Sequence, residues 1–414
     1  MDGREAVNVP LDLHSREFQE DPAPTLAWLR QHDPVHRSHY GYWLLTRHDD
    51  VAAAFRDSRL SSEWSKKGSL PGMSARTVAE TADPFTRAQQ VVLHSFNMKD
   101  PPAHTRIRQL VQQAFTRAAV DEQRPRITQL VDDLLTTAIA AGSLDLVTEL
   151  AFPLTITIAS EMLGIPSDAR DEFRASFEAT ERLGDPTASA EQRIAGREAL
   201  VWQLQFIADV VEQRRSRPQA DLATALVQAE EHGETLTNDE ILAALLTLYT
   251  AGGTTTERMV SSGILLLLQH PEQLALLREQ PQLLGGTVSE ILRFHHPNQQ
   301  TSTARLALEP IELRGKVIEA GHTVRLGTGA ANRDPERWPE PDRFLITRPE
   351  MVSLSFGQGI HYCIGAPLAR LQTQLAIARL LERCTTLRLG KGELRHDPRR
   401  MDRYERIRVT VSER

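Results

Sequence analysis

Apolar residues recur every three or four positions over most of the chain, the spacing that places them on one face of an α-helix. Glycine and proline residues separate the successive apolar stretches, as expected where one helix ends and another begins. The pattern predicts helices at Asp21–Arg30, Asp49–Phe55, Arg124–Ala141, Thr148–Leu163, Asp168–Leu183, Glu191–Arg215 and Ile364–Arg383.

A smaller β region is predicted by short segments in which apolar and polar residues alternate. Between Asp57 and Met98 neither periodicity persists, and the scattered serines, glycines and prolines there predict one long loop. The predicted fold class is therefore mainly α with a smaller β region. The strands are expected at Val35–Arg37, Tyr42–Leu45, Ile311–Leu313, Lys316–Ile318, Thr323–Leu326 and Arg406–Val411.

The longest helical pattern begins at Thr237 and ends before Pro271. Thr237 and Glu240 have the Thr-x-x-Glu spacing of a capping box, in which the two side chains bond each other's backbone N–H groups. Within the pattern lies AGGTTT, residues 251–256. Two adjacent glycines cost about 1 kcal/mol each relative to alanine, and threonines compete for backbone carbonyls. A weak helical sequence at this point indicates a functional site, and a crossing of small residues is the structural alternative.

One cysteine, Cys363, stands in the stretch FGQGIHYCIGAPLAR with three glycines around it, immediately before a helical pattern. Glycines let a backbone approach a bulky, flat group closely. A thiolate at a helix N-terminus is stabilised by unpaired N–H groups and the helix dipole. Such a sulfur can bind iron, and a thiolate ligand favours O–O cleavage. The alternative is a structural cysteine in a glycine-containing turn.

This stretch resembles the haem-binding loop of the cytochrome P-450 family, whose form is F-G-x-G-x-H-x-C-x-G, and the match covers the whole loop. The resemblance implies the cytochrome P-450 fold, with haem b held between the long central helix and the cysteine loop. It implies that Cys363 is the axial ligand of the iron and that Phe356, Gly357 and Ala251 contact the cofactor.

Four basic residues are expected to hold the haem propionates. His104 and Arg108 stand four positions apart after Asp-Pro-Pro, so both project from one helix face and suit an anionic group. A solvated helix face is the alternative for such a pair. The resemblance adds Arg305 and His361 to the propionate ligands.

The resemblance also assigns catalytic roles within AGGTTT. It places Thr255 at the position of the family's oxygen-activating threonine, where a hydroxyl would offer a hydrogen bond to O2. The family usually has an acidic residue just before that threonine, and this chain has Thr254. We expect Thr254 and Thr255 to act in proton delivery, with Glu257, three residues after Thr254, either replacing the acid or merely solvated.

A structural network is expected away from the chemistry. Glu290 and Arg293 are three residues apart in SEILRF and can pair on one helix. The family resemblance predicts that this pair is buried and joined by Arg343 from WPEPDRF. Residues 298–301 correspond to positions where the family lines its substrate pocket.

Composition narrows the class of protein further. With 414 residues and a net charge of -7, the chain has no basic run and is not expected to bind nucleic acid. Its N-terminal sequence has neither a signal-peptide core nor a membrane span, so no membrane association is expected. The second cysteine, Cys384, is expected to be a small buried hydrophobe. These features predict a cytoplasmic protein.

The prediction as a whole is a single catalytic domain, residues 1–414, acting as a haem-thiolate monooxygenase of the soluble bacterial type. It would insert one oxygen atom of O2 into a small or mid-sized apolar substrate by hydroxylation or epoxidation, in natural-product metabolism. Its electrons would come from a ferredoxin and a ferredoxin reductase. The alternatives are atypical cytochrome P-450 chemistry (oxidative coupling, dehydrogenation or peroxide-driven oxidation), because Thr254 replaces the usual acid, and a catalytically silent partner protein.

Overall fold

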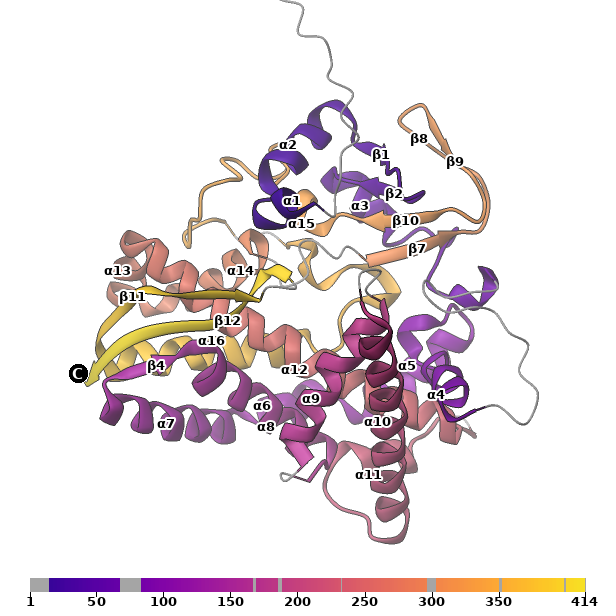
Figure 1. The fold of residues 1–414 in the computed structure, drawn as a ribbon, viewed down its shortest axis with the longest axis horizontal. Coiled ribbons are helices and arrows are strands. Elements are labelled where there is room, and N and C mark those ends of the chain that lie inside the picture. Colours follow the sequence, from indigo (N-terminus) through magenta and orange to yellow (C-terminus); the bar gives the residue numbers. More distant parts are fainter. Residues whose placement is uncertain are drawn as a thin grey trace, which may run out of the picture.

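The computed structural model describes residues 15–67, 83–166, 169–184, 188–231, 233–295, 303–349, 352–397 and 400–413. Helices form most of the molecule, and two separate groups of strands lie at its periphery (Figure 1). The predicted fold class is confirmed. The helices are α1 (Arg16–Glu20), α2 (Ala23–His32), α3 (His48–Ala54), α4 (Pro84–Val92), α5 (Ala103–Ala114), α6 (Arg117–Asp121), α7 (Arg124–Ala141), α8 (Phe152–Leu163), α9 (Arg170–Glu181), α10 (Ala190–Ser216), α11 (Leu222–Gln228), α12 (Asn238–Gln269), α13 (Pro271–Glu279), α14 (Leu284–Phe294), α15 (Thr328–Ala331) and α16 (Ala366–Arg383).

Helix α12 is the longest, and it passes through the middle of the helical body. Its predicted capping box is confirmed, because the Glu240 N–H donates to Thr237 Oγ1 at 3.3 Å and the Thr237 N–H donates to Glu240 Oε2 at 2.8 Å. The helix packs against α8, α10 and α16. Its C-terminal half contributes leucines to the largest apolar cluster, so its position is fixed by burial on several sides.

The strands form two main sheets. One has five strands in the order β1-β2-β10-β7-β3, with β10 parallel to β2 and the other neighbours antiparallel. The other has the order β11-β12-β4 and packs beside α7 and α16 (Figure 1). Strands β5 with β6 and β8 with β9 form separate hairpins. The bounds are β1 (Val35–Arg37), β2 (Trp43–Leu45), β3 (Leu60–Ser61), β4 (Ser143–Asp145), β5 (Glu230–Glu231), β6 (Glu234–Thr235), β7 (Thr303–Ala307), β8 (Ile311–Leu313), β9 (Lys316–Ile318), β10 (Thr323–Leu326), β11 (Cys384–Asp397) and β12 (Arg400–Glu413).

Two predicted segments differ from the structure. The expected loop from Asp57 to Met98 contains α4, which Asp83 caps by accepting hydrogen bonds from the N–H groups of Phe85 and Thr86; residues 68–82 lie outside the described part. The helix expected from Thr148 begins as a π-helical segment, Leu146–Ala151, before α8. The combined stretch Leu146–Leu163 is long and apolar enough to cross a membrane, but 67% of it is buried in the protein, as in a core helix.

The buried pair of Glu290 and Arg293 is confirmed, but its third member is Arg348 and the prediction of Arg343 was wrong. Arg293 donates to both Glu290 carboxylate oxygens, at 2.7 and 2.8 Å, and Arg348 Nε donates to the same carboxylate at 3.2 Å. Arg343 contributes only its backbone carbonyl, which accepts from Arg293. Its side chain turns outward, is 62% exposed and pairs with Glu340.

This arrangement predicts a large difference between two substitutions. Glu290→Ala leaves the guanidinium groups of Arg293 and Arg348 buried without their carboxylate, and should lower the free energy of unfolding by about 3 to 5 kcal/mol. Arg343→Ala removes only an exposed pair and should cost less than about 1 kcal/mol. Urea unfolding of the two variants and the parent measures both effects, and equal losses would contradict the assignment of Arg348.

Candidate active site

The loop that carries Cys363 is shaped by its glycines. Gly357 and Gly359 have φ of +69° and +70°, which other residues rarely adopt. A Cβ on Gly359 would lie 2.8 Å from the Phe55 carbonyl oxygen, and one on Gly357 would lie 3.2 Å from the Phe55 ring. These two glycines therefore let the loop pack against the end of α3, a different role from the approach to a flat group that the sequence suggested.

Cys363 lies just before α16, with Gly365 at the N-cap position of that helix. Its N–H donates to the Phe356 carbonyl at 2.9 Å, which fixes the turn. The residue is solvent-accessible on one side, while the protein around it excludes enough water that burial raises the pKa of the thiol. Hydrogen bonds from the N–H groups of Gly365 and Ala366 and the charge of Arg108 act in the opposite direction. A bound cationic metal would complete the change to a thiolate.

Four basic side chains gather near this loop, as predicted: His104, Arg108, Arg305 and His361. The ring centroids of His104 and His361 are 4.3 Å apart. The positive charges of Arg305 and Arg108 help to lower the pKa of His361. Burial lowers the pKa of His104 to about 4, of His361 to about 3 and of Arg305 to about 10. The two imidazoles are therefore neutral at pH 7.

The hydrogen bonding of this basic cluster is incomplete within the described residues. Neither ring nitrogen of buried His104 has a partner. Arg305 donates to the Ala304 carbonyl and Arg108 to the Tyr362 carbonyl, and among the described residues none of the four basic side chains pairs with a carboxylate. The nearby Asp100 is bonded instead to Ser61, Ser62 and Lys66. Buried donors without an acid fit an anionic group, so these residues suit the two propionates of a haem.

Helix α12 presents a second part of the site. Ala251 and Thr255 are four residues apart and share a face, and Thr255 Oγ1 donates to the Ala251 carbonyl at 2.6 Å. A Cβ on Gly252 would meet nothing within 4 Å, whereas one on Gly253 would lie 3.6 Å from Ile156. Gly252 thus borders open space and Gly253 is a packing residue. As placed, Thr255 offers its oxygen lone pairs to a ligand, because its proton is bound to the helix.

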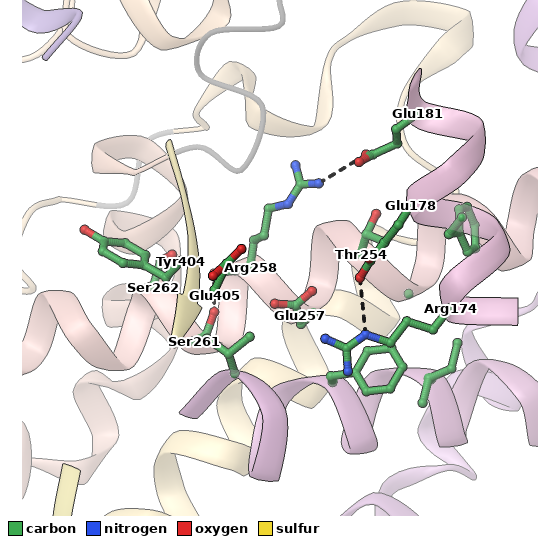
Figure 2. Close-up of a pocket in the computed structure, with 15 residues that line it drawn as sticks. Arg174, Glu178, Glu181, Thr254, Glu257, Arg258, Ser261, Ser262, Tyr404 and Glu405 are labelled. Carbon is green, nitrogen blue, oxygen red and sulfur yellow. Dashed lines mark hydrogen bonds and ion pairs between the residues drawn. The ribbon is translucent and has the colours of Figure 1, made fainter. Parts of the chain in front are cut away.

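Thr254 lies on a neighbouring face of α12. It lines a cavity with Glu257 and with charged residues of α9 and β12 (Figure 2). The structure therefore brings Thr254 and Thr255 to two different surroundings. Of the other expected site residues, Phe356 packs beside Arg370 and Tyr362, and residues 298–301 lie outside the described part.

A groove beside Cys363 was missed by the sequence reasoning. It has a volume of about 520 Å³ and lies between α5, α6 and α16. Basic side chains outnumber acidic ones among the described residues that line the groove, where Asp121 is the one acidic residue. The sequence feature that could have indicated this groove was Arg370, which lies seven residues beyond Cys363 on the following helix. The basic residues of the groove are Arg108, Arg117, Arg124 and Arg370.

Comparison with known proteins gives consistent matches. A family model described as Cytochrome P-450 matches residues 76–398. The cytochrome P-450 monooxygenase PikC of Streptomyces venezuelae is 39% identical over 93% of this chain and 90% of its own length. The 6-deoxyerythronolide B hydroxylase of Saccharopolyspora erythraea is 38% identical over 92% of each chain. Among solved structures, the bacillaene polyketide synthase cytochrome P-450 PksS of Bacillus subtilis has a TM-score of 0.85 and 32% identity, over 97% of this chain and 100% of that one.

Separate substitution of the two cysteines tests which one binds the iron. Cys363→Ser should abolish the red-shifted absorption band of the reduced, CO-bound protein, because that band requires a thiolate on the iron. Cys384→Ala should keep the band, since Cys384 is fully buried in the apolar core. A band that survives in Cys363→Ser and disappears in Cys384→Ala would refute the assignment.

Removal of the basic cluster should loosen the cofactor. Each charge-assisted hydrogen bond to a propionate contributes about 1.5 to 3 kcal/mol, so Arg108→Ala and Arg305→Ala should each weaken haem binding about 10- to 100-fold. Transfer of haem to an excess of apomyoglobin measures the loss. Arg117→Ala is the control, because this side chain is 92% exposed. Parent-like haem retention in both cluster variants would contradict the propionate assignment.

Proposed function

Because the chain belongs to the cytochrome P-450 family, we propose that Cys363 binds the haem iron and that the face of α12 formed by Ala251 and Thr255 borders the site of oxidation. The protein is a haem-thiolate monooxygenase of the soluble bacterial type that binds haem b and acts in secondary metabolism. The observation that carries the residue assignments is the basic cluster next to a cysteine at a helix N-terminus, in which the buried ring nitrogens of His104 have no partner among the described residues.

The bound haem supplies the activation of O2, and the protein residues supply binding, orientation and protons. His104, Arg108, Arg305 and His361 would hold the propionates and so position the cofactor next to the cysteine loop. Phe356 and Gly357 belong to that loop and set its approach to the cofactor. Ala251 would leave room for the haem beside α12, and Thr255 would hold a hydrogen-bonded group there through its oxygen atom.

The substrate class is inferred from relatives. PikC, the 6-deoxyerythronolide B hydroxylase and the polyketide biosynthesis protein PksS cover nearly the whole of this chain at 34% identity or more. We infer a small or mid-sized apolar substrate, an intermediate of natural-product metabolism, that is hydroxylated or epoxidised. The domain is proposed to be one catalytic unit over residues 1–414, working in the cytoplasm.

A ferredoxin supplied by a ferredoxin reductase is the proposed electron source. The groove beside Cys363 supports this, because it is basic while ferredoxins are acidic, and it brings the surface close to the sulfur ligand. Tyr362 and Ile360 are exposed apolar residues of the same loop. A small contact of apolar and basic residues is typical of transient electron-transfer complexes.

Atypical chemistry remains the second candidate, and the observation that favours it is Thr254. The position that usually carries an acid has a hydroxyl here, on a face different from that of Thr255. Oxidative coupling, dehydrogenation or peroxide-driven oxidation would depend less on that acid.

The role of Thr255 is tested by the product formed per electron consumed. Thr255→Ala should leave substrate binding and reduction unchanged but divert electrons to hydrogen peroxide, because the hydroxyl that organises proton delivery is gone. Thr255→Ser keeps the hydroxyl and should retain most of the coupling. Thr250→Ala is the control, since Thr250 makes a similar bond to the Thr247 carbonyl at 3.1 Å. Unchanged product and peroxide yields in Thr255→Ala would exclude a direct role.

A further inference from the structure

The cavity lined by Thr254 occupies a face of α12 next to the face of Ala251 and Thr255. Successive helical residues are rotated by about 100°, so Thr254 lies at the boundary between the two faces. The cavity has a volume of about 280 Å³. Because one water needs roughly 10 to 15 Å³ of such space, the cavity can hold a chain of waters.

The walls of this cavity are unusually rich in carboxylates. Its described lining residues include four glutamates and two arginines, which come from α9, α12 and β12. Two ion pairs border it, Arg174 Nε to Glu178 Oε1 at 3.6 Å and Arg258 Nη2 to Glu181 Oε1 at 3.7 Å (Figure 2). A surplus of carboxylates around water favours the uptake of protons into the cavity.

One carboxylate of the cavity is close in sequence to the missing acid. Glu257 follows Thr254 by three residues, so the two side chains are neighbours on the helix surface, and both line the cavity. In Figure 2 the Glu257 carboxylate points into the space bordered by the two ion pairs.

The two adjacent threonines differ in how their hydroxyls are bonded. The Thr255 hydroxyl donates to the Ala251 carbonyl. The Thr254 hydroxyl makes no hydrogen bond to protein within the described residues, so it can accept a hydrogen bond from one water and donate to another. This is the property that a relay needs.

We propose that Glu257 supplies the protons for oxygen activation, passing them through the Thr254 hydroxyl and cavity waters to the Ala251 and Thr255 face. This inference rests on the proposed function. Each turnover joins a substrate C–H bond, one O2, two electrons and two protons to give C–OH and one water. The electrons come from the ferredoxin, each proton leaves the Glu257 carboxyl group, and a cavity water returns a proton to the carboxylate.

The first experiment measures product per electron in the holoenzyme with its electron carriers. Glu257→Gln keeps the shape of the side chain but removes the exchangeable acid, and should lower product per electron roughly tenfold. This loss is smaller than the usual contribution of a general acid, because water can still enter the cavity and deliver protons. The solvent deuterium isotope effect should rise as well. Thr254→Asp in the Glu257→Gln background restores an acid at the family's usual position and should recover the coupling.

Glu405→Gln is the matched control. Glu405 lines the same cavity from β12 and pairs with Arg395 at 2.9 Å, so its loss changes the charge of the cavity without touching the α12 face. Its product per electron should stay at the parent level. An equal loss in Glu257→Gln and Glu405→Gln would overturn the proposal, because total cavity charge would then be the cause.

A second readout does not depend on turnover. Infrared difference spectra of the resting protein, titrated from acid to alkaline buffer, should contain a carboxyl band that shifts in D2O, disappears in Glu257→Gln and persists in Glu405→Gln. The charged and titratable groups that face Glu257 are Glu178, Glu181 and Arg174 from α9, Arg258 from α12, and Tyr404 and Glu405 from β12.

The outcomes separate this inference from the proposed function. If Glu257→Gln retains the thiolate absorption band and the parent product yield, or if the exchangeable carboxyl band survives in it, the relay through Glu257 is wrong while the monooxygenase stands. If the parent itself lacks the thiolate band, the proposed function fails first.

Discussion

The burial of basic side chains without acidic partners is the constraint on which the site depends. A buried guanidinium or imidazole costs free energy unless its donors are satisfied. His104 and Arg305 are almost fully buried, and the described part of the chain gives them no carboxylate. Asp100, whose charge acts on both residues, is already hydrogen-bonded to Ser61, Ser62 and Lys66. Under the proposed assignment this charge is available to the propionates of haem, and haem binding would stabilise the region that surrounds them.

Helix α12 connects that cofactor site to the rest of the molecule. Its ends are conventional, with a complete capping box at Thr237 and a leucine-rich half in the main core. Its middle has residues with poor helix propensity, and it stays helical because α8, α10 and α16 pack against it. This separation of tasks lets the middle carry two different surfaces, one apolar and open at Ala251 and Gly252, the other polar at Thr254 and Glu257.

Local signals in the sequence were reliable where a few neighbouring residues set the structure. The Thr237 capping box was predicted correctly and the strands β1, β8, β9 and β10 were predicted with their bounds, because turns and caps depend on residues close in sequence. Strands β7 and β11 were missed, although β7 pairs with β10 and β11 pairs with the next strand along the chain, β12. Arg348 was missed because the family motif pointed to Arg343, whose side chain is exposed and pairs with Glu340.

Both cavities escaped prediction because each joins elements that are distant in sequence. The groove beside Cys363 combines α5, α6 and α16, and the cavity behind Thr254 combines α9, α12 and β12. Their chemistry nevertheless follows a simple rule of helix geometry. An acid one residue before Thr255 and an acid two residues after it lie on the same neighbouring face, since three residues make nearly one turn. Moving the carboxyl group from position 254 to Glu257 therefore keeps it on the cavity side of α12, and in the proposed relay the Thr254 hydroxyl stands between the cavity and the face of Ala251 and Thr255.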